Sequence, residues 1–305
     1  MSDRTDILVN VVTGSTPTDK EGLIYTCNCG WIDLGHMSSP QEPRIEIGAT
    51  NLWRQIKEEI GEKRDDGFII KYAQDHGGGD GSAKKGMGKY FGSHQSYWIK
   101  SGLSLSEKKS VALTIFKEVS VEFESVQNNI MSSVTNSGFS QEDLVSDLIG
   151  LYIAIGEISR EQVLSLCYTV NGKMALKLWD KHGAVGENKN KTFLPKFNKI
   201  EEIVEEDEKC DCLNQPNIFP KELQTIKSIE KGILFKDYDI EDVISDAYDD
   251  VEKKVSKTIN EGKKAIKNVK EKVNDVMKDL DYLEEKANKA KSVIDDFFNF
   301  IPQVY

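Results

Sequence analysis

The apolar pattern near the end of the chain most restricts how this sequence can fold. Apolar or small residues recur there at alternating steps of four and three: Val255, Ile259, Gly262, Ile266, Val269, Val273, Val276, Leu280, Leu283, Ala287, Ala290, Ile294 and Phe297. Such steps place one narrow stripe along a helix, as in a heptad repeat, and a helix of this length extends roughly 60 Å. The pattern predicts a coiled-coil-like helix over 237–305. Its seam from Val255 to Phe297 would pair with another copy, with the preceding segment 240–251 folded back, or with a different protein.

The net charge of the chain argues against one class of partner. Of the 305 residues, 30% are charged, and the net charge is -11. Binding to a nucleic acid backbone depends on clustered Lys and Arg, so we expect no nucleic acid partner. Much of the acidic excess falls in 201–211, from which we expect an acidic and polar linker over 200–236.

The sequence shows no targeting or membrane segment. Its first residues are acidic as well as basic, and the apolar run over 7–12 is shorter than a signal peptide requires. No window approaches the roughly 18 apolar residues of a membrane-spanning helix. We therefore expect synthesis in the cytoplasm and no transmembrane segment. Delivery outside the cell by a route without a signal peptide stays open.

Residues 1–199 are typical of one α+β domain. Strand-like runs fall at 7–12, 23–26, 68–72 and 97–99, with a helix over 51–60. From Ser106 the apolar residues follow helical spacing, which predicts helices over 106–131, from Ser140, over 160–168 and over 173–179. The fold class is therefore α+β, with mixed strands first, a helical second half, and the long C-terminal helix.

Four of the five cysteines form two Cys-x-Cys pairs, Cys27 with Cys29 and Cys210 with Cys212. An odd count without a leader argues against a disulfide framework, so we expect unrelated reduced thiols. A zinc ion shared by the two pairs, or a redox pair, is the alternative, although structural zinc sites prefer a wider spacing.

The richest candidate site lies within ten residues of the first cysteine. It places a thiol at Cys29, a carboxylate at Asp33 and an imidazole at His36, with glycines between them. On a helical turn Asp33 and His36 would share one face, where Asp33 could orient the ring of a general base or both could bind a metal. Cys29 could instead be a nucleophile activated by His36. A tight turn whose polar groups satisfy one another is the structural alternative.

A second acidic cluster opens the helix expected from Ser140. Glu142 and Asp143 begin it, and Asp147 follows Asp143 by one turn, so those two aspartates share a face. These acids could simply favour the helix dipole. If the helix packs beside His36, Glu142 and Asp143 would complete one site with it. The Gly-rich stretch 77–81 suggests a phosphate-binding loop but lacks the Lys-Ser/Thr ending.

These segments carry a resemblance to known sequences. The string from Cys29 to His36 (C-G-W-I-D-L-G-H), followed by 138–150, resembles an uncharacterised family of bacterial proteins. It is also similar to proteins encoded with contractile injection systems, which implies a cargo or effector role and a carrier complex as partner. The resemblance covers about 20–200. It departs at Asp147, where Asn is expected.

Two functions of different class follow from the sequence. The first is a hydrolase-like bacterial effector or cargo protein, with a toxin-like role, whose catalytic residues are Asp33 and His36 with Cys29 or with Glu142 and Asp143. The second is a non-catalytic structural or adaptor protein that assembles through its C-terminal coiled coil. A nucleotide-binding module on the Gly-rich loop is a third alternative, and the sequence identifies neither a cofactor nor a metal.

Overall fold

The fold is α+β, as the sequence predicts. The computed structural model describes residues 2–38, 42–74, 93–130, 138–204, 211–214 and 217–239. The heptad seam, the Gly-rich stretch 77–81 and Cys210 lie outside these residues.

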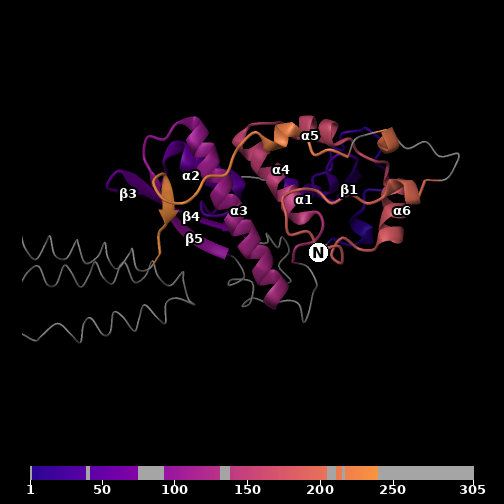
Figure 1. The fold of residues 1–305 in the computed structure, drawn as a ribbon, viewed down its shortest axis with the longest axis horizontal. Coiled ribbons are helices and arrows are strands. Elements are labelled where there is room, and N and C mark those ends of the chain that lie inside the picture. The colour runs from indigo at the N-terminus through magenta and orange to yellow at the C-terminus, as the bar shows by residue number, and fades with distance from the viewer. Residues whose placement is uncertain are drawn as a thin grey trace, which may run out of the picture.

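A four-stranded antiparallel sheet forms one end of the described body (Figure 1). Its strands lie in the order β3 (Glu62–Arg64), β4 (Gly67–Gln74), β5 (Ser93–Lys100) and β6 (Phe235–Asp237). Phe68, Ile70 and Tyr72 alternate along β4 and are all buried in the main core, as the period of two in a strand requires. Helices α2 (Ala49–Glu58) and α3 (Leu105–Ile130) pack against this sheet.

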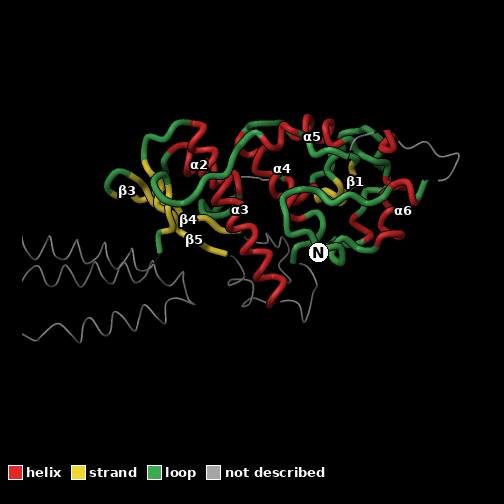
Figure 2. The backbone as a smooth tube through the Cα atoms, in the orientation of Figure 1, coloured by secondary structure: helices red, strands yellow, loops and turns green. Residues whose placement is uncertain are grey.

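The other end of the body is built on a hairpin of β1 (Leu23–Thr26) and β2 (Gly30–Asp33), seen as the separate strand pair in Figure 2. Helices α5 (Arg160–Cys167) and α6 (Gly172–His182) lie at this end. A second, smaller core forms here, in which Trp31 makes edge-on contacts with Tyr25 and Trp179 at 5.1 and 6.0 Å.

Helix α4 (Asp143–Ile155) lies between the two ends (Figure 1). It contacts α2, α3, β2 and the short helix α1 (Leu34–Met37), and most of its residues are buried. The α1 backbone approaches it closely at Gly150, where a Cβ atom would lie 3.0 Å from the carbonyl oxygen of His36. A side chain at this position would require the backbone of α1 to move by a few tenths of an ångström, so glycine favours the close packing of α1 on α4. Within the described ranges, no helix combines the length and the apolar character needed to cross a lipid bilayer.

Most of the predicted elements are confirmed, with the first strand and the linker as exceptions. Residues 7–12 form no strand but only a bridge from Ile7 to Leu23, and of the apolar side chains that follow, Val9 and Val12 are exposed.

The linker predicted over 200–236 is wrong for its described part. Phe219, Leu223 and Phe235 are buried in the main core, and Phe235 begins the edge strand β6 paired with β5. The charge run dominates the composition of this segment, but these few apolar side chains decide where it packs.

The cysteines also depart from the prediction, because four of them are joined in two disulfides. Cys27 pairs with Cys212 and Cys29 with Cys167, each with a Cα–Cα distance of 5.2 Å. Cys27 and Cys29, two residues apart, thus have different partners. The spacing along the chain did not reveal this, because both partners of the 27–29 turn are distant in sequence.

The packing of the C-terminal segment gives a stability prediction. Replacing Phe235 by Ala should lower the free energy of unfolding by about 3 kcal/mol, because it leaves a cavity in the main core. Ile233→Ala is the matched control. Ile233 is 81% exposed, so its loss should change the free energy by less than about 0.5 kcal/mol in urea denaturation. Equal effects of the two variants would show that this segment does not pack as described.

The disulfides give a second prediction, measured by thiol titration. Protein purified without reductant and then unfolded should expose one thiol per chain out of five cysteines, because Cys27, Cys29, Cys167 and Cys212 are paired. Reduction should raise the count to five. A count of five before reduction would contradict the pairing.

Candidate functional site

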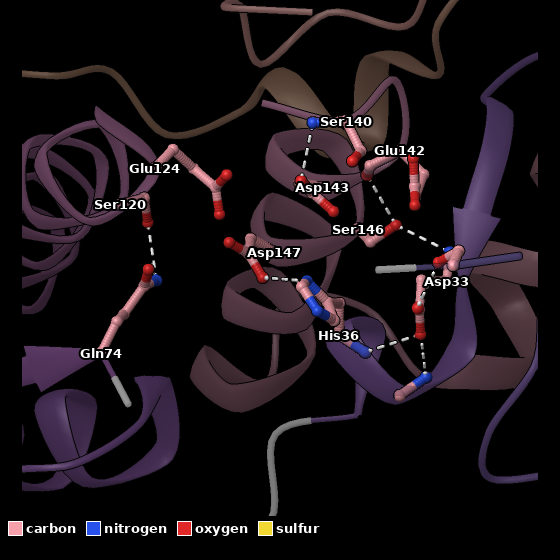
Figure 3. Close-up of polar contacts among 12 residues, drawn as sticks. Asp33, His36, Gln74, Ser120, Glu124, Ser140, Glu142, Asp143, Ser146 and Asp147 are labelled. Atoms are coloured by element: carbon pink, nitrogen blue, oxygen red, sulfur yellow. Dashed lines mark hydrogen bonds and ion pairs between the residues drawn. The ribbon is translucent and has the colours of Figure 1, made fainter. Parts of the chain in front are cut away.

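Polar side chains from three helices meet where α1 packs on α4, beside α3 (Figure 3). We call the set His36, Glu124, Glu142, Asp143 and Asp147 the His36 cluster. It joins both candidate sites of the sequence, since His36 comes from α1 and three of the acids come from α4 or its N-cap.

The pair of His36 and Asp147 forms the accessible edge of this cluster. Nδ1 of His36 lies 3.3 Å from Oδ1 of Asp147, and the two side chains are 30% and 14% exposed. Burial disfavours the imidazolium. The hydrogen bond and charge of Asp147, with the charges of Asp143 and Asp33, outweigh it and raise the pKa of His36 well above its ordinary value. These contacts favour the protonated form of the ring.

Asp33 has a different role from the one predicted. Its Oδ1 accepts hydrogen bonds from the backbone N–H groups of Gly35 and His36, at 2.7 and 3.1 Å, so it caps the first turn of α1. The residue that contacts the imidazole ring is Asp147. The backbone N–H of Asp33 donates to Oγ of Ser146 at 2.9 Å, and this bond holds the start of α1 against α4.

The three remaining acids are buried behind the pair. Burial and the charge of Asp143 raise the pKa of Glu124 to about 9 and that of Glu142 to about 8. Burial likewise raises the pKa of Asp143, although the charge of His36 opposes it. Glu124 accepts a hydrogen bond from the backbone N–H of Phe139 at 2.6 Å. Glu142 is 1% exposed, and a hydrogen bond from Ser2 partly opposes the rise of its pKa. Glu124 and Glu142 are therefore neutral at pH 7.

Further polar groups line the cluster from the sheet side. The side-chain amide of Gln74 on β4 donates to Oγ of Ser120 on α3 at 2.7 Å (Figure 3). Tyr72, also on β4, is fully buried; burial raises the pKa of its hydroxyl, and a hydrogen bond with Gln74 opposes this. Burial lowers the pKa of Lys189, although the nearby charges of Asp143, Glu124 and Glu142 raise it.

Cys29 does not belong to the site. It is fully buried and its sulfur is joined to that of Cys167, so it is not the nucleophile that the sequence suggested. Cys27 and Cys212 are likewise engaged with each other rather than with zinc. Within the described ranges, no three or more His, Cys, Asp and Glu side chains are grouped closely enough to hold a metal ion.

Sequence reasoning missed Glu124 altogether and left the role of Asp147 in doubt. The signal for Glu124 was present, because Phe116, Ser120 and Glu124 follow one another at four-residue steps on a predicted helix. A carboxylate on the same stripe as a core phenylalanine is expected to be buried. Its meeting with His36 depends on the packing of α3, α4 and α1, which the spacing along the chain does not show.

The His36–Asp147 contact gives a prediction for NMR titration. Asp147→Asn should lower the pKa of His36 by at least about one pH unit, because the charge that offsets burial is removed. Asp33→Asn is the matched control. The charge of Asp33 affects the pKa of His36 less than that of Asp147 does, and Asn keeps an oxygen that can cap α1. The shift should therefore be smaller. An unchanged titration of His36 in Asp147→Asn would contradict the contact.

Comparison with known proteins assigns the chain to no family. No protein-family model, no curated protein and no solved structure matches the chain.

Proposed function

We propose that the protein is a hydrolase that uses the His36 cluster for acid–base catalysis. The observation that supports this most is a partly exposed imidazole, with a raised pKa, that contacts Asp147 beside buried carboxyl groups. Carboxyl and imidazole groups that lie together and have perturbed pKa values are typical of catalytic sites.

The proposed step divides acid and base between two residues. The Asp143 carboxylate takes a proton from water as the water oxygen bonds to the electrophilic atom of the substrate. The bond to the leaving group then breaks, and the His36 imidazolium gives its proton to that group. Asp147 keeps the imidazole oriented and charged. A carboxylate whose pKa is raised by burial is a stronger base than an exposed one, which suits Asp143 to this role.

Asp33 and Ser146 act on this chemistry indirectly. By capping α1 and bonding it to α4, they fix the position of His36 relative to Asp147. Because Glu124 and Glu142 are neutral at pH 7, they add no negative charge beside Asp143. In this proposal the protein acts as an effector or cargo, and the predicted seam from Val255 to Phe297 would attach it to its carrier.

A structural or adaptor role is the second candidate. It is favoured by the heptad seam, which requires a partner whatever the globular part does. The same site variants separate the two candidates, because an adaptor does not depend on the protonation of His36.

The hydrolase proposal predicts how the rate depends on two side chains and on pH. A panel of p-nitrophenyl esters, phosphodiesters and glycosides, with peptide p-nitroanilides, supplies the assay. His36→Gln and Asp143→Asn should each lower kcat/KM by at least about a hundredfold. The rate should rise as Asp143 loses its proton and fall at higher pH as His36 does. Asp147→Asn should move the alkaline fall to lower pH, since it lowers the pKa of His36.

His182→Gln is the control for this experiment. His182 ends α6, and its ring contacts the backbone of Lys199 rather than the His36 cluster, so its loss should leave the rate unchanged. Full activity of folded His36→Gln would overturn the proposal. Folded wild-type protein without activity on the whole panel would favour the adaptor instead.

A further inference from the structure

The four-stranded sheet has one face in the main core and one outside it. Side chains alternate along each strand, and residues directly opposite each other on neighbouring strands share a face. Phe68, Tyr97 and Phe235 lie on the face that belongs to the main core, and α2 and α3 cover that face because they join the same core. The described residues of the other face, which we call the outer face, are Glu62, Arg64, Gly67, Ile69, Lys71, Ala73, Ser96, Trp98, Lys100 and Lys236.

The centre of the outer face is apolar. Ile69 and Trp98 lie directly opposite each other on β4 and β5, and neither belongs to one of the two cores. The indole ring of Trp98 lies over Gly67, where an added Cβ atom would collide with it. Trp98 is partly exposed, whereas the other three tryptophans of the chain are buried. A tryptophan that lies along a sheet outside the core is well suited to contact an apolar partner.

Basic side chains accompany this apolar pair. Three lysines share the outer face with it: Lys71 on β4, Lys100 on β5 and Lys236 on β6. The one acid among the described residues of this face, Glu62, forms an ion pair with Arg64 at 2.6 Å. The outer face is therefore basic, on a chain whose net charge is -11. A basic surface with an apolar centre fits an acidic, amphipathic partner.

The chain itself carries such a partner directly after the sheet. The backbone N–H of Tyr238 donates to the carbonyl oxygen of Ser96 at 2.9 Å, so the chain leaves the sheet at its β6 edge. Asp239, a typical N-cap residue, precedes the segment 240–251. This segment has apolar residues at helical spacing, and the rest of it includes five acids and no Lys or Arg. The apolar residues are Ile240, Val243, Ile244, Ala247 and Val251.

The length of this segment also matches the sheet. A helix over 240–251 is about 18 Å long. Four strands spaced about 4.8 Å apart measure about 14 Å from the first to the last. A helix that begins beside β6 is therefore long enough to reach Lys100 on β5 and Lys71 on β4.

The heptad seam is the other surface within the chain on which 240–251 could pack. The seam begins at Val255, so a helix folded back on it has to reverse direction within 252–254. Those residues are Glu, Lys and Lys, which favour a helix, and no Gly or Pro occurs from 240 to 261. The sequence therefore favours a helix that continues past Val251 over one that turns back there.

We propose that the segment 240–251 packs on the outer face as a helix, with its apolar residues on Ile69 and Trp98 and its acids beside Lys71 and Lys100. The inference goes beyond the proposed hydrolase, because it involves no residue of the His36 cluster. It attaches the C-terminal tail to the sheet and leaves the seam from Val255 to Phe297 for another copy or for a carrier.

Carbodiimide cross-linking of the full chain tests this contact, because the reagent joins a lysine to a carboxylate beside it. In an equal mixture of isotopically labelled and unlabelled protein, mass spectrometry should find Lys71 or Lys100 joined to acids of 241–250 within one chain. Links from these acids to lysines after Gly262 instead would overturn the inference in favour of a helix folded back on the seam. Links between labelled and unlabelled chains would overturn it in favour of a second copy. Absence of any link from either lysine to 241–250 would overturn it as well.

Tryptophan fluorescence tests the apolar part of the contact with two neighbouring substitutions. Ile244→Asp places a charge on the apolar side of the segment, so it should release the helix from Trp98, raise acrylamide quenching and shift the emission to longer wavelength. Ser245→Asp is the matched control, because it adds the same charge on the polar side and should leave both signals as in wild type. Trp98 dominates the change, since the remaining tryptophans are buried: Trp31, Trp53 and Trp179. The same response from both variants would contradict the proposed packing.

Discussion

The close contact between α1 and α4 is the constraint on which the site depends. A hydrogen at Gly150 in place of a side chain lets the backbone of His36 and Met37 lie directly on α4. The hydrogen bond from Asp33 to Ser146 fixes the same contact one turn nearer the start of α4. Together these two contacts place His36 beside Asp147, although neither of them involves the imidazole ring.

This contact also brings acids into a place where burial opposes their ionisation. Because the pKa values of Glu124 and Glu142 are raised above those of the unfolded chain, the folded state holds protons that the unfolded state has lost at pH 7. Stability therefore declines as the pH rises from the ordinary pKa of glutamate toward about 8 and 9. Buried glutamates of this kind therefore lower the free energy of unfolding at neutral pH, as is common at functional sites.

The sequence predicted the secondary structure better than the contacts between elements. Strand β4 and helices α2, α3, α5 and α6 follow from local periodicity, because their buried faces repeat every two or about 3.6 residues. The placement of Phe235 on the sheet and of Glu124 beside His36 could not be read in this way. Each depends on residues more than eighty positions apart in the chain, and nothing in the local pattern states which distant surface they meet.

The sequence grouped His36 with Asp33, whereas the carboxylate that contacts the imidazole is that of Asp147. Asp33 is three residues away along the chain, yet its carboxylate turns back to the backbone N–H groups of its own helix. Capping a helix is the stronger local demand on an aspartate at that position. The imidazole instead contacts Asp147, which the packing of α1 on α4 brings beside it.

The two disulfides constrain how this chain can move between compartments. Cys27–Cys212 and Cys29–Cys167 join residues 185 and 138 positions apart, and the shorter loop lies within the longer one. A chain closed in this way cannot pass end-first through a pore that admits one extended strand. Transport through such a pore requires the cysteines to be reduced at that moment, with the cross-links formed afterwards. An oxidised chain needs a conduit as wide as the folded domain, so the redox state of four buried sulfurs determines which kind of passage is open to it.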